Sequence, residues 1–409
     1  MRTCTAKSEW LPFELDHVGV LDGIRILAVL IVLWFHFWQQ TWLMPFYPTP
    51  FLNWLGIRQI DFNMIRRCGF LCVDLMIMLS GFVLFLPYAK RVFLNTPVDS
   101  VLLFYRKRAA RIIPSYLFAV LVMFFTAVHN GAYIGKSMFM WRDLLTHLTF
   151  TFMLRADTYL FSSINGVFWT VVIELLFYSI FPLISRLFQR KPLFTYIGMT
   201  AVGLIFTFGY CVKQTNQLGF LVNRFLTFMP VFANGMLGAF LYVWYVLKCP
   251  NSIKWFCSSL GTVFAVIGVY ILLKMFRSCA ASKSIQSWQL TYRYPLSVVY
   301  LLVVLGFSVS LKPFRFLLAN RLSASLSLIT YNLYLWHQFL IVQLKQSFGC
   351  STGADVAALG VNTQWMLNIE GLVAAFSIAF LTTFLIERPF SSLILRGSAR
   401  PKNIINQGE

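Results

Sequence analysis

The stretch LDGIRILAVLIVLWFHFWQ, residues 21–39, places an arginine and a histidine inside a run that is otherwise apolar enough to cross a membrane. Arg25 and His36 are eleven residues apart. On an α-helix of about 3.6 residues per turn this spacing brings both side chains to one face, about 16 Å apart in depth. Polar groups inside a membrane span are costly and usually functional. The stretch therefore predicts a membrane helix whose polar face carries a site.

A structural explanation of the same stretch is also open. Arg25 can extend to the lipid headgroups, and His36 can form a hydrogen bond between helices. Asp22 lies three residues before Arg25, which predicts a neighbouring ion pair at the start of the helix. The ionisable residues of the other predicted spans decide between these explanations.

The composition is that of a polytopic membrane protein. The chain has 409 residues, of which 58% are hydrophobic and 12% charged, and its mean hydropathy is +0.71. A soluble domain of this composition would expose large apolar patches. The formal net charge of +20 would suggest nucleic acid binding in a soluble protein, but basic cytoplasmic loops explain it better here. We expect the lipid bilayer, and no nucleic acid, as a partner.

Ten predominantly apolar runs approach the length of about 20 residues that a helix needs to cross the hydrocarbon. We expect an all-α fold, a polytopic membrane helix bundle with about ten transmembrane helices. Lys and Arg are densest in the short loop 88–111, so both termini are predicted to be cytoplasmic. The predicted spans are 24–43, 67–87, 110–128, 166–187, 193–211, 225–247, 256–275, 294–311, 323–345 and 369–387.

The predicted domains are a cytoplasmic segment (1–20), a membrane-embedded domain (21–390) and a cytoplasmic tail (391–409) that we expect to be disordered. Two outer loops are longer than a connection needs. Residues 44–66 mix Pro with aromatic residues and suit the membrane interface. Residues 129–165 are apolar enough for a half-buried or re-entrant helix, and an eleventh crossing there would overturn the topology.

The eight cysteines are scattered, with no paired ligand spacing, so we expect neither a metal site nor a disulfide framework. Residues 1–20 lack the apolar core of a cleavable signal peptide. The sequence also has no Asn-X-Ser/Thr acceptor, which favours a bacterial source. The expected location is a bacterial inner membrane.

Three more ionisable groups lie inside predicted spans, namely Asp74, Glu174 and His337. At about 1.5 Å per residue they fall roughly 18 to 21 Å from the cytoplasmic side, near the depth of His36. Convergence of four titratable groups at one depth is what a buried site requires. It is not expected of independent structural residues.

The sequence resembles the integral-membrane acyltransferase 3 family over nearly its whole length. LDGIRILAVLIVLWFH resembles the opening signature of that family, and Arg108 and Arg111 match its Arg-x-x-Arg pair before Pro. The matching segments follow one another in the family's order: FLCVDLMIMLSGFVLF, YRKRAARIIPSYL, FWTVVIELLFY, RFLTFMPVFANGMLGAFL, YNLYLWHQFLI and IERPF. The resemblance implies transfer of an acyl group, commonly acetyl, from cytoplasmic acyl-coenzyme A to a hydroxyl of a carbohydrate or other small molecule.

Coenzyme A carries several phosphates, which a cluster of guanidinium groups can bind. We expect Arg106, Lys107, Arg108 and Arg111 to form such a cluster, although ordinary anchoring of a cytoplasmic loop also explains them. Arg25 is expected to bind phosphate or to orient the pantetheine arm. Acetyl-CoA, or another acyl-CoA, is thus predicted as a donor substrate, with no permanently bound cofactor.

Esterification needs a base for the hydroxyl proton, and neutral imidazole is the usual choice near pH 7. We assign that role to His36, with Glu174 fixing its tautomer, and leave a covalent acyl-enzyme open. Asp22 is the expected partner of Arg25. Asp74 either pairs with a buried arginine or holds helix contacts, and His337 is either supporting or structural.

Two other classes of protein compete with this interpretation. A secondary transporter also places acids and histidines at mid-membrane, but no pair of matched broken helices is found in the sequence. A structural or partner-binding membrane protein predicts that His36 is dispensable.

Overall fold

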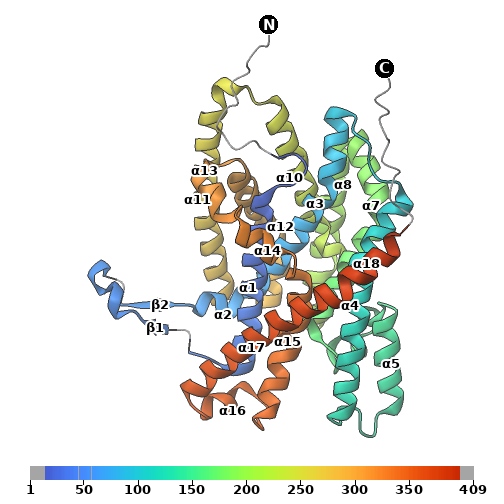
Figure 1. Cartoon of the computed structure of the whole chain (residues 1–409), viewed down its shortest axis with the longest axis vertical. Coiled ribbons are helices and arrows are strands. Elements are labelled where there is room, and N and C mark those ends of the chain that lie inside the picture. Colours follow the sequence, from blue (N-terminus) through green and yellow to red (C-terminus); the bar gives the residue numbers. More distant parts are fainter. Residues whose placement is uncertain (1–13, 45, 57, 397–409) are drawn as a thin grey trace, which may run out of the picture.

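The computed structural model describes residues 14–44, 46–56 and 58–396, which form a helical bundle (Figure 1). The strands in this part of the chain are β1 (Phe46–Pro48) and β2 (Gln59–Asp61), an antiparallel pair in which Tyr47 faces Ile60. The helices of the first half are α1 (Gly19–Thr41), α2 (Asn63–Cys68), α3 (Cys72–Leu94), α4 (Val101–His129), α5 (Ser137–Leu148), α6 (Ala156–Leu160), α7 (Trp169–Arg190) and α8 (Pro192–Gly209). Those of the second half are α9 (Leu218–Leu221), α10 (Met229–Lys248), α11 (Lys254–Ala281), α12 (Ile285–Val309), α13 (Lys312–Leu318), α14 (Arg321–Ser327), α15 (Thr330–Ser347), α16 (Gly353–Ala358), α17 (Val361–Thr382) and α18 (Arg388–Leu395). The predicted all-α polytopic bundle is confirmed.

Nine helical segments among the described residues are long and apolar enough to cross a membrane, and they match nine of the ten predicted spans in order. The predicted span 323–345 instead covers α14 and α15, which are separate helices. Helix α15 has 18 residues and includes His337, Gln338 and Lys345. It packs against α1 and α17, and this enclosure explains how so polar a helix is accommodated.

Small residues allow the central helices to approach closely. A Cβ on Gly235 of α10 would lie 2.0 Å from the carbonyl oxygen of Met78 in α3. A Cβ on Gly81 of α3 would lie 2.6 Å from the carbonyl oxygen of Phe232 in α10. Membrane helices gain their association energy largely from such close packing. The α3–α10 pair is thus a rigid support for the helices around it.

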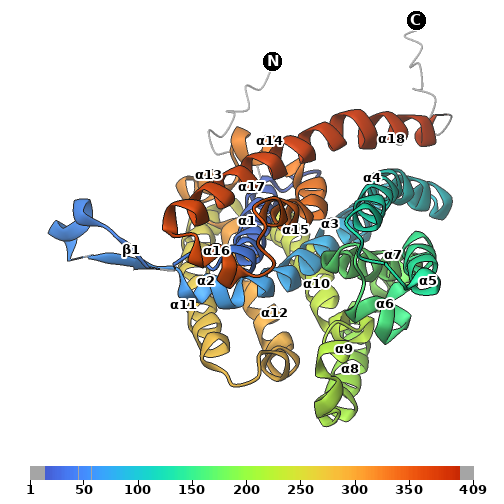
Figure 2. The same cartoon turned by 90° about the horizontal axis from the view of Figure 1, so that it is seen from below.

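Helix α1 lies inside the bundle, where it packs against α3, α15 and α17 (Figure 2). Its buried apolar residues include Val29, Val32 and Leu33. Arg25 and His36 are half-buried on this helix. The stretch from which the fold was predicted is therefore a central helix.

The two long loops differ in structure. In 44–66, β1 and β2 form a hairpin that reaches out sideways from the bundle (Figure 1), and Phe51 and Trp54 near its tip are 72% and 79% exposed. In 129–165, α5 has 12 residues, too short to cross the bilayer, so the described part of this loop contains no eleventh crossing.

The ends of the described chain correct one boundary. The predicted disordered tail began at residue 391, but α18 continues to Leu395. The rest of the predicted tail, 397–409, and residues 1–13 of the predicted N-terminal segment lie outside the described residues.

Candidate functional site

A pocket between α1, α3, α4, α7 and α15 brings together four of the predicted site residues. Arg25, Arg108, Arg111 and Glu174 all line it. Its empty volume is about 830 Å³, its open mouth included. The other polar lining residues are Ser80, Thr170, Tyr178, Thr330, Tyr331 and Tyr334. We call this space the arginine pocket; with three guanidinium groups and one carboxylate, it is suited to an anion.

Glu174 is held inside the arginine pocket by two hydroxyl groups. Ser80 donates to one carboxylate oxygen (2.7 Å) and Tyr178 to the other (3.3 Å). The predicted pairing of Glu174 with His36 is not formed, because no hydrogen bond or ion pair joins the two side chains among the described residues. Glu174 and His36 do lie at similar predicted depths, but their helices present them to different neighbours.

His36 forms a pair with His337, and the two ring centroids are 5.1 Å apart. The Nδ1 atom of His36 donates to the amide oxygen of Gln39 (3.0 Å). This hydrogen bond places the proton on Nδ1 and leaves Nε2 of His36 with a free lone pair. Gln39 thus has the tautomer-fixing position that we predicted for Glu174, and its place three residues after His36 on one helix was a readable signal.

His337 has the same tautomer for a different reason. Its Nδ1 atom donates to the backbone carbonyl of Tyr334 (2.7 Å), and the residue is 1% exposed. Its Nε2 atom is buried and has no hydrogen-bond partner among the described residues. Because Tyr334 also lines the arginine pocket, that pocket ends one helical turn before the histidine pair.

The predicted patch of four basic residues is divided. Arg106 donates to the carbonyl oxygens of Ile394 (2.7 Å) and Arg396 (3.3 Å) at the end of α18. Lys107 forms an ion pair with Asp99 (2.6 Å). Successive residues on a helix differ by about 100° in direction, so only Arg108 and Arg111, three residues apart, share the face of α4 that lines the pocket.

Asp22 and Asp74 are engaged elsewhere. Asp22 accepts from Nε2 of His17 (2.7 Å), and the predicted ion pair with Arg25 is not formed between these described residues. Asp74 forms a buried ion pair with Arg293 (3.2 Å), which selects the buried-arginine alternative. Arg293 also donates to the carbonyl of Val222 (2.6 Å), so this cluster ties α3 to α12 and has no place in the arginine pocket.

A second pocket lies between the end of α4, residues 162–166 and α15, with an empty volume of about 790 Å³. Its polar lining is made only of amides and hydroxyls: Asn130, Ser162, Ser163, Asn165, Gln338, Gln343 and Gln346. We call it the neutral pocket. Asn165 donates to the carbonyl of Leu335 (2.9 Å) on α15, two residues before His337, and Oε1 of Gln338 is buried without a partner among the described residues.

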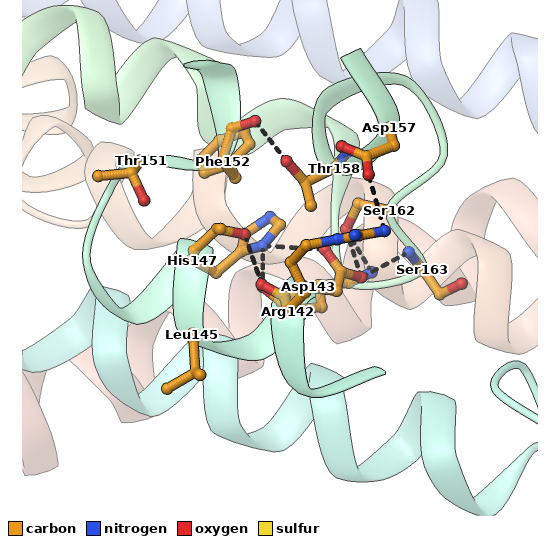
Figure 3. Close-up of polar contacts among 12 residues, drawn as sticks. Arg142, Asp143, Leu145, His147, Thr151, Phe152, Asp157, Thr158, Ser162 and Ser163 are labelled. Atoms are coloured by element: carbon orange, nitrogen blue, oxygen red, sulfur yellow. Dashed lines mark hydrogen bonds and ion pairs between the residues drawn. The ribbon is translucent and has the colours of Figure 1, made fainter. Parts of the chain in front are cut away.

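Asp143 of α5 holds one wall of the neutral pocket in place (Figure 3). One of its carboxylate oxygens accepts from Ser162 (3.1 Å) and from the backbone N–H of Ser163 (3.3 Å). The same oxygen accepts from Tyr133 (2.6 Å), and His147 lies 3.2 Å from the other oxygen. Burial raises the pKa of Asp143, but the hydrogen bonds from His147 and Tyr133 outweigh it and hold that pKa below its usual range. This cluster was not predicted from the sequence, although Asp143 and His147 are four residues apart on a helix.

Comparison with known proteins supplies the final finding. A family model described as an acyltransferase domain matches residues 18–388. A protein of Acidianus two-tailed virus named "Putative acetyltransferase ORF330" is 25% identical over 334 residues, which cover 81% of this chain and 84% of the viral protein. No solved structure matches the chain.

Proposed function

Because the chain belongs to the acyltransferase 3 family, we propose that it is a membrane O-acyltransferase that moves an acyl group, commonly acetyl, from cytoplasmic acyl-CoA to a hydroxyl group. The acceptor is a carbohydrate or another small molecule, and the membrane is the inner membrane of a bacterium. One observation carries this proposal. His337, whose ring lies 5.1 Å from that of His36, follows Tyr334 of the arginine pocket by one turn of α15 and directly precedes Gln338 of the neutral pocket.

The arginine pocket is the proposed donor site. Arg108 and Arg111 bind the diphosphate of acyl-CoA through charge-assisted hydrogen bonds. Arg25 orients the pantetheine arm, which extends along α1 toward His36 over about 16 Å. Glu174, fixed by Ser80 and Tyr178, supplies a counter-charge that lets three guanidinium groups share one pocket before the donor binds.

The histidine pair is the proposed reaction centre. Nε2 of His36 takes the proton from the acceptor hydroxyl as its oxygen attacks the thioester carbonyl. The tetrahedral intermediate then collapses, the bond from carbon to sulfur breaks, and the imidazolium returns its proton to the coenzyme A thiolate. Gln39 keeps the proton of His36 on Nδ1, and His337 packs against the ring and supports its orientation.

The neutral pocket is the proposed acceptor site. Its amides and hydroxyls can exchange hydrogen bonds with several hydroxyl groups of one ligand without requiring a charge. The buried amide oxygen of Gln338 lacks a donor in the described chain, and such a group gains a hydrogen bond when a hydroxyl reaches it. These features favour a neutral polyol over an anionic acceptor.

The test uses the purified full chain in liposomes, radiolabelled acetyl-CoA and a panel of neutral monosaccharides. The expected result is release of coenzyme A together with an alkali-labile labelled ester. Release of neither product with any donor would contradict the proposal. Accumulation of unmodified sugar inside the vesicles without a donor would support the transporter instead.

A further inference from the structure

A third pocket lies where α3 and α7 end and α4 begins, and it is strongly basic. Arg91, Arg186 and Arg190 line it, with an empty volume of about 960 Å³. These three arginines are exposed and form no ion pair among the described residues. The acidic residue of the pocket, Asp99, is already paired with Lys107 (2.6 Å). We call this space the rim pocket; its guanidinium charges are available to an anion.

The rim pocket and the arginine pocket lie one after the other along the same faces of α3 and α7, and we call the two compartments together the groove. On α7, residues 171, 174 and 178 line the arginine pocket, and 182, 185 and 189 line the rim pocket. Steps of three and four residues keep all six positions on one face of the helix. The same holds on α3, where Ser80 and Leu84 precede Tyr88 and Arg91.

Helix α4 runs through the groove in the opposite direction. Val101 lines the rim pocket, and Arg108 and Arg111 line the arginine pocket. Between the compartments lies an aromatic cluster in which the buried Phe181 ring lies 5.3 Å from Tyr88 and 5.2 Å from Phe104. The guanidinium of Arg108 lies 5.8 Å from the Phe104 ring, so a cation stands at the junction.

The charges along the groove follow an order. At its deep end, toward the histidine pair, the lining is neutral, with Thr170 and Tyr334. Guanidinium groups come next in the arginine pocket and again in the rim pocket. From Glu174 to Arg190, sixteen residues of α7 rise about 24 Å. The groove therefore suits an elongated ligand with one neutral end and phosphate at two separate points.

We propose that the rim pocket binds the 3′-phosphate of coenzyme A through Arg91, Arg186 and Arg190 and so makes the enzyme selective for 3′-phosphorylated donors. This inference rests on the proposed function. Coenzyme A has a neutral pantetheine arm, then a diphosphate, then an adenosine whose ribose carries the 3′-phosphate, so its charges follow the same order as those of the groove. A phosphate monoester carries nearly two charges near pH 7, and several guanidinium groups suit it better than a diester.

The test compares the affinities of the full chain in neutral-lipid nanodiscs for coenzyme A and for 3′-dephospho-coenzyme A, measured by calorimetry. Wild type is expected to bind coenzyme A at least about tenfold more tightly than it binds the dephosphorylated form. Arg186→Ala/Arg190→Ala is expected to reduce this ratio to near one by weakening only coenzyme A. Arg186→Lys/Arg190→Lys, which keeps the charges, retains part of the preference.

Lys191→Ala is the matched control. Lys191 follows Arg190 but lies over the Phe194 ring (6.0 Å) and lines neither compartment. Its loss is expected to leave the ratio at the wild-type value. Size-exclusion profiles establish that every variant is folded.

The other outcomes separate the two proposals. If wild type binds both ligands equally, or if the double alanine variant keeps the preference, the rim pocket assignment is overturned while donor binding stands. If wild type binds neither ligand, the proposed function itself fails. If the double alanine variant keeps the preference for coenzyme A but loses co-purified phosphatidylglycerol, the arginines bind a lipid headgroup, and this inference is wrong.

Discussion

The arginine pocket and the neutral pocket differ in charge. The arginine pocket has three guanidinium groups and one carboxylate, whereas the neutral pocket is lined by amides and hydroxyls without a charged residue in the described chain. An enzyme that joins a polyphosphorylated donor to an uncharged acceptor needs this difference. The charge of each pocket therefore indicates the kind of substrate that the pocket binds, independently of the reaction that joins the two substrates.

The largest expected effect comes from removing His36, the proposed base. His36→Ala should lower the transfer rate by about 10²- to 10⁴-fold, since general base catalysis contributes that much. Affinity for the donor should stay near wild type, because the arginine pocket is intact. His129→Ala, a change at an exposed histidine outside both compartments, is the control. Transfer that survives in His36→Ala would remove His36 from the mechanism.

The next largest effect is expected in the arginine pocket. Arg108→Ala should raise the Kd for acyl-CoA by about 10- to 100-fold, because a hydrogen bond to a charged group contributes about 1.5 to 3 kcal/mol. Arg106→Ala is a matched control on the same helix, since Arg106 binds the end of α18. Calorimetry with coenzyme A measures both. Equal losses of affinity in the two variants would mean that general surface charge, and not the arginine pocket, determines donor binding.

A smaller effect is expected at the wall of the neutral pocket. Asp143→Asn should destabilise the fold by about 1 to 3 kcal/mol at pH 7, because it removes the charged acceptor for Tyr133, Ser162 and the backbone N–H of Ser163. Thermal unfolding in detergent measures the loss.

The pH dependence of that effect has a definite sign. The folded pKa of Asp143 lies below its ordinary value of 3.8, so its stabilisation is fully present above pH 3.8 and is lost as the pH falls through the folded pKa. The difference between wild type and variant should therefore shrink in acid. A difference that grows as the pH falls would contradict the assignment.

The smallest effect is expected at Gln39. Gln39→Ala removes a neutral hydrogen bond worth about 0.5 to 1.5 kcal/mol, so kcat should fall only a few-fold while both substrate affinities are kept. Gln39→Glu restores an acceptor for Nδ1 of His36 and should recover the rate lost in the alanine variant. A change in donor affinity in either variant would place Gln39 in the arginine pocket instead.

The sequence predicted the order of the helices, but not which neighbouring helix each buried polar group faces. Hydropathy located nine spans because lipid-facing helices must be apolar. Hydropathy did not predict the break between α14 and α15 within the expected span 323–345. Helix α15 is enclosed by its neighbours and can therefore be polar. Depth counting placed Glu174 near His36, yet Glu174 is bound by Ser80 and Tyr178.

Residues on one helix were the most predictable part of the site. The three-residue spacing of Arg108 and Arg111 accounts for their common face, whereas Arg106 and Lys107 of the expected cluster point elsewhere. The basic residues at the rim, such as Arg186 and Arg190, looked like ordinary cytoplasmic loop charge. Their common groove appears only when α3, α4 and α7 are brought side by side, because it depends on contacts between helices distant in sequence.

In the proposed mechanism, the donor enters from the side of the arginine pocket and reacts at the histidine pair. Its most direct test is release of coenzyme A from acetyl-CoA by proteoliposomes of uniform, independently determined orientation, with neutral monosaccharides on both sides. We expect release only when acetyl-CoA is on the side where Arg186 and Arg190 are exposed. Equal release from acetyl-CoA supplied on the opposite side alone would contradict it.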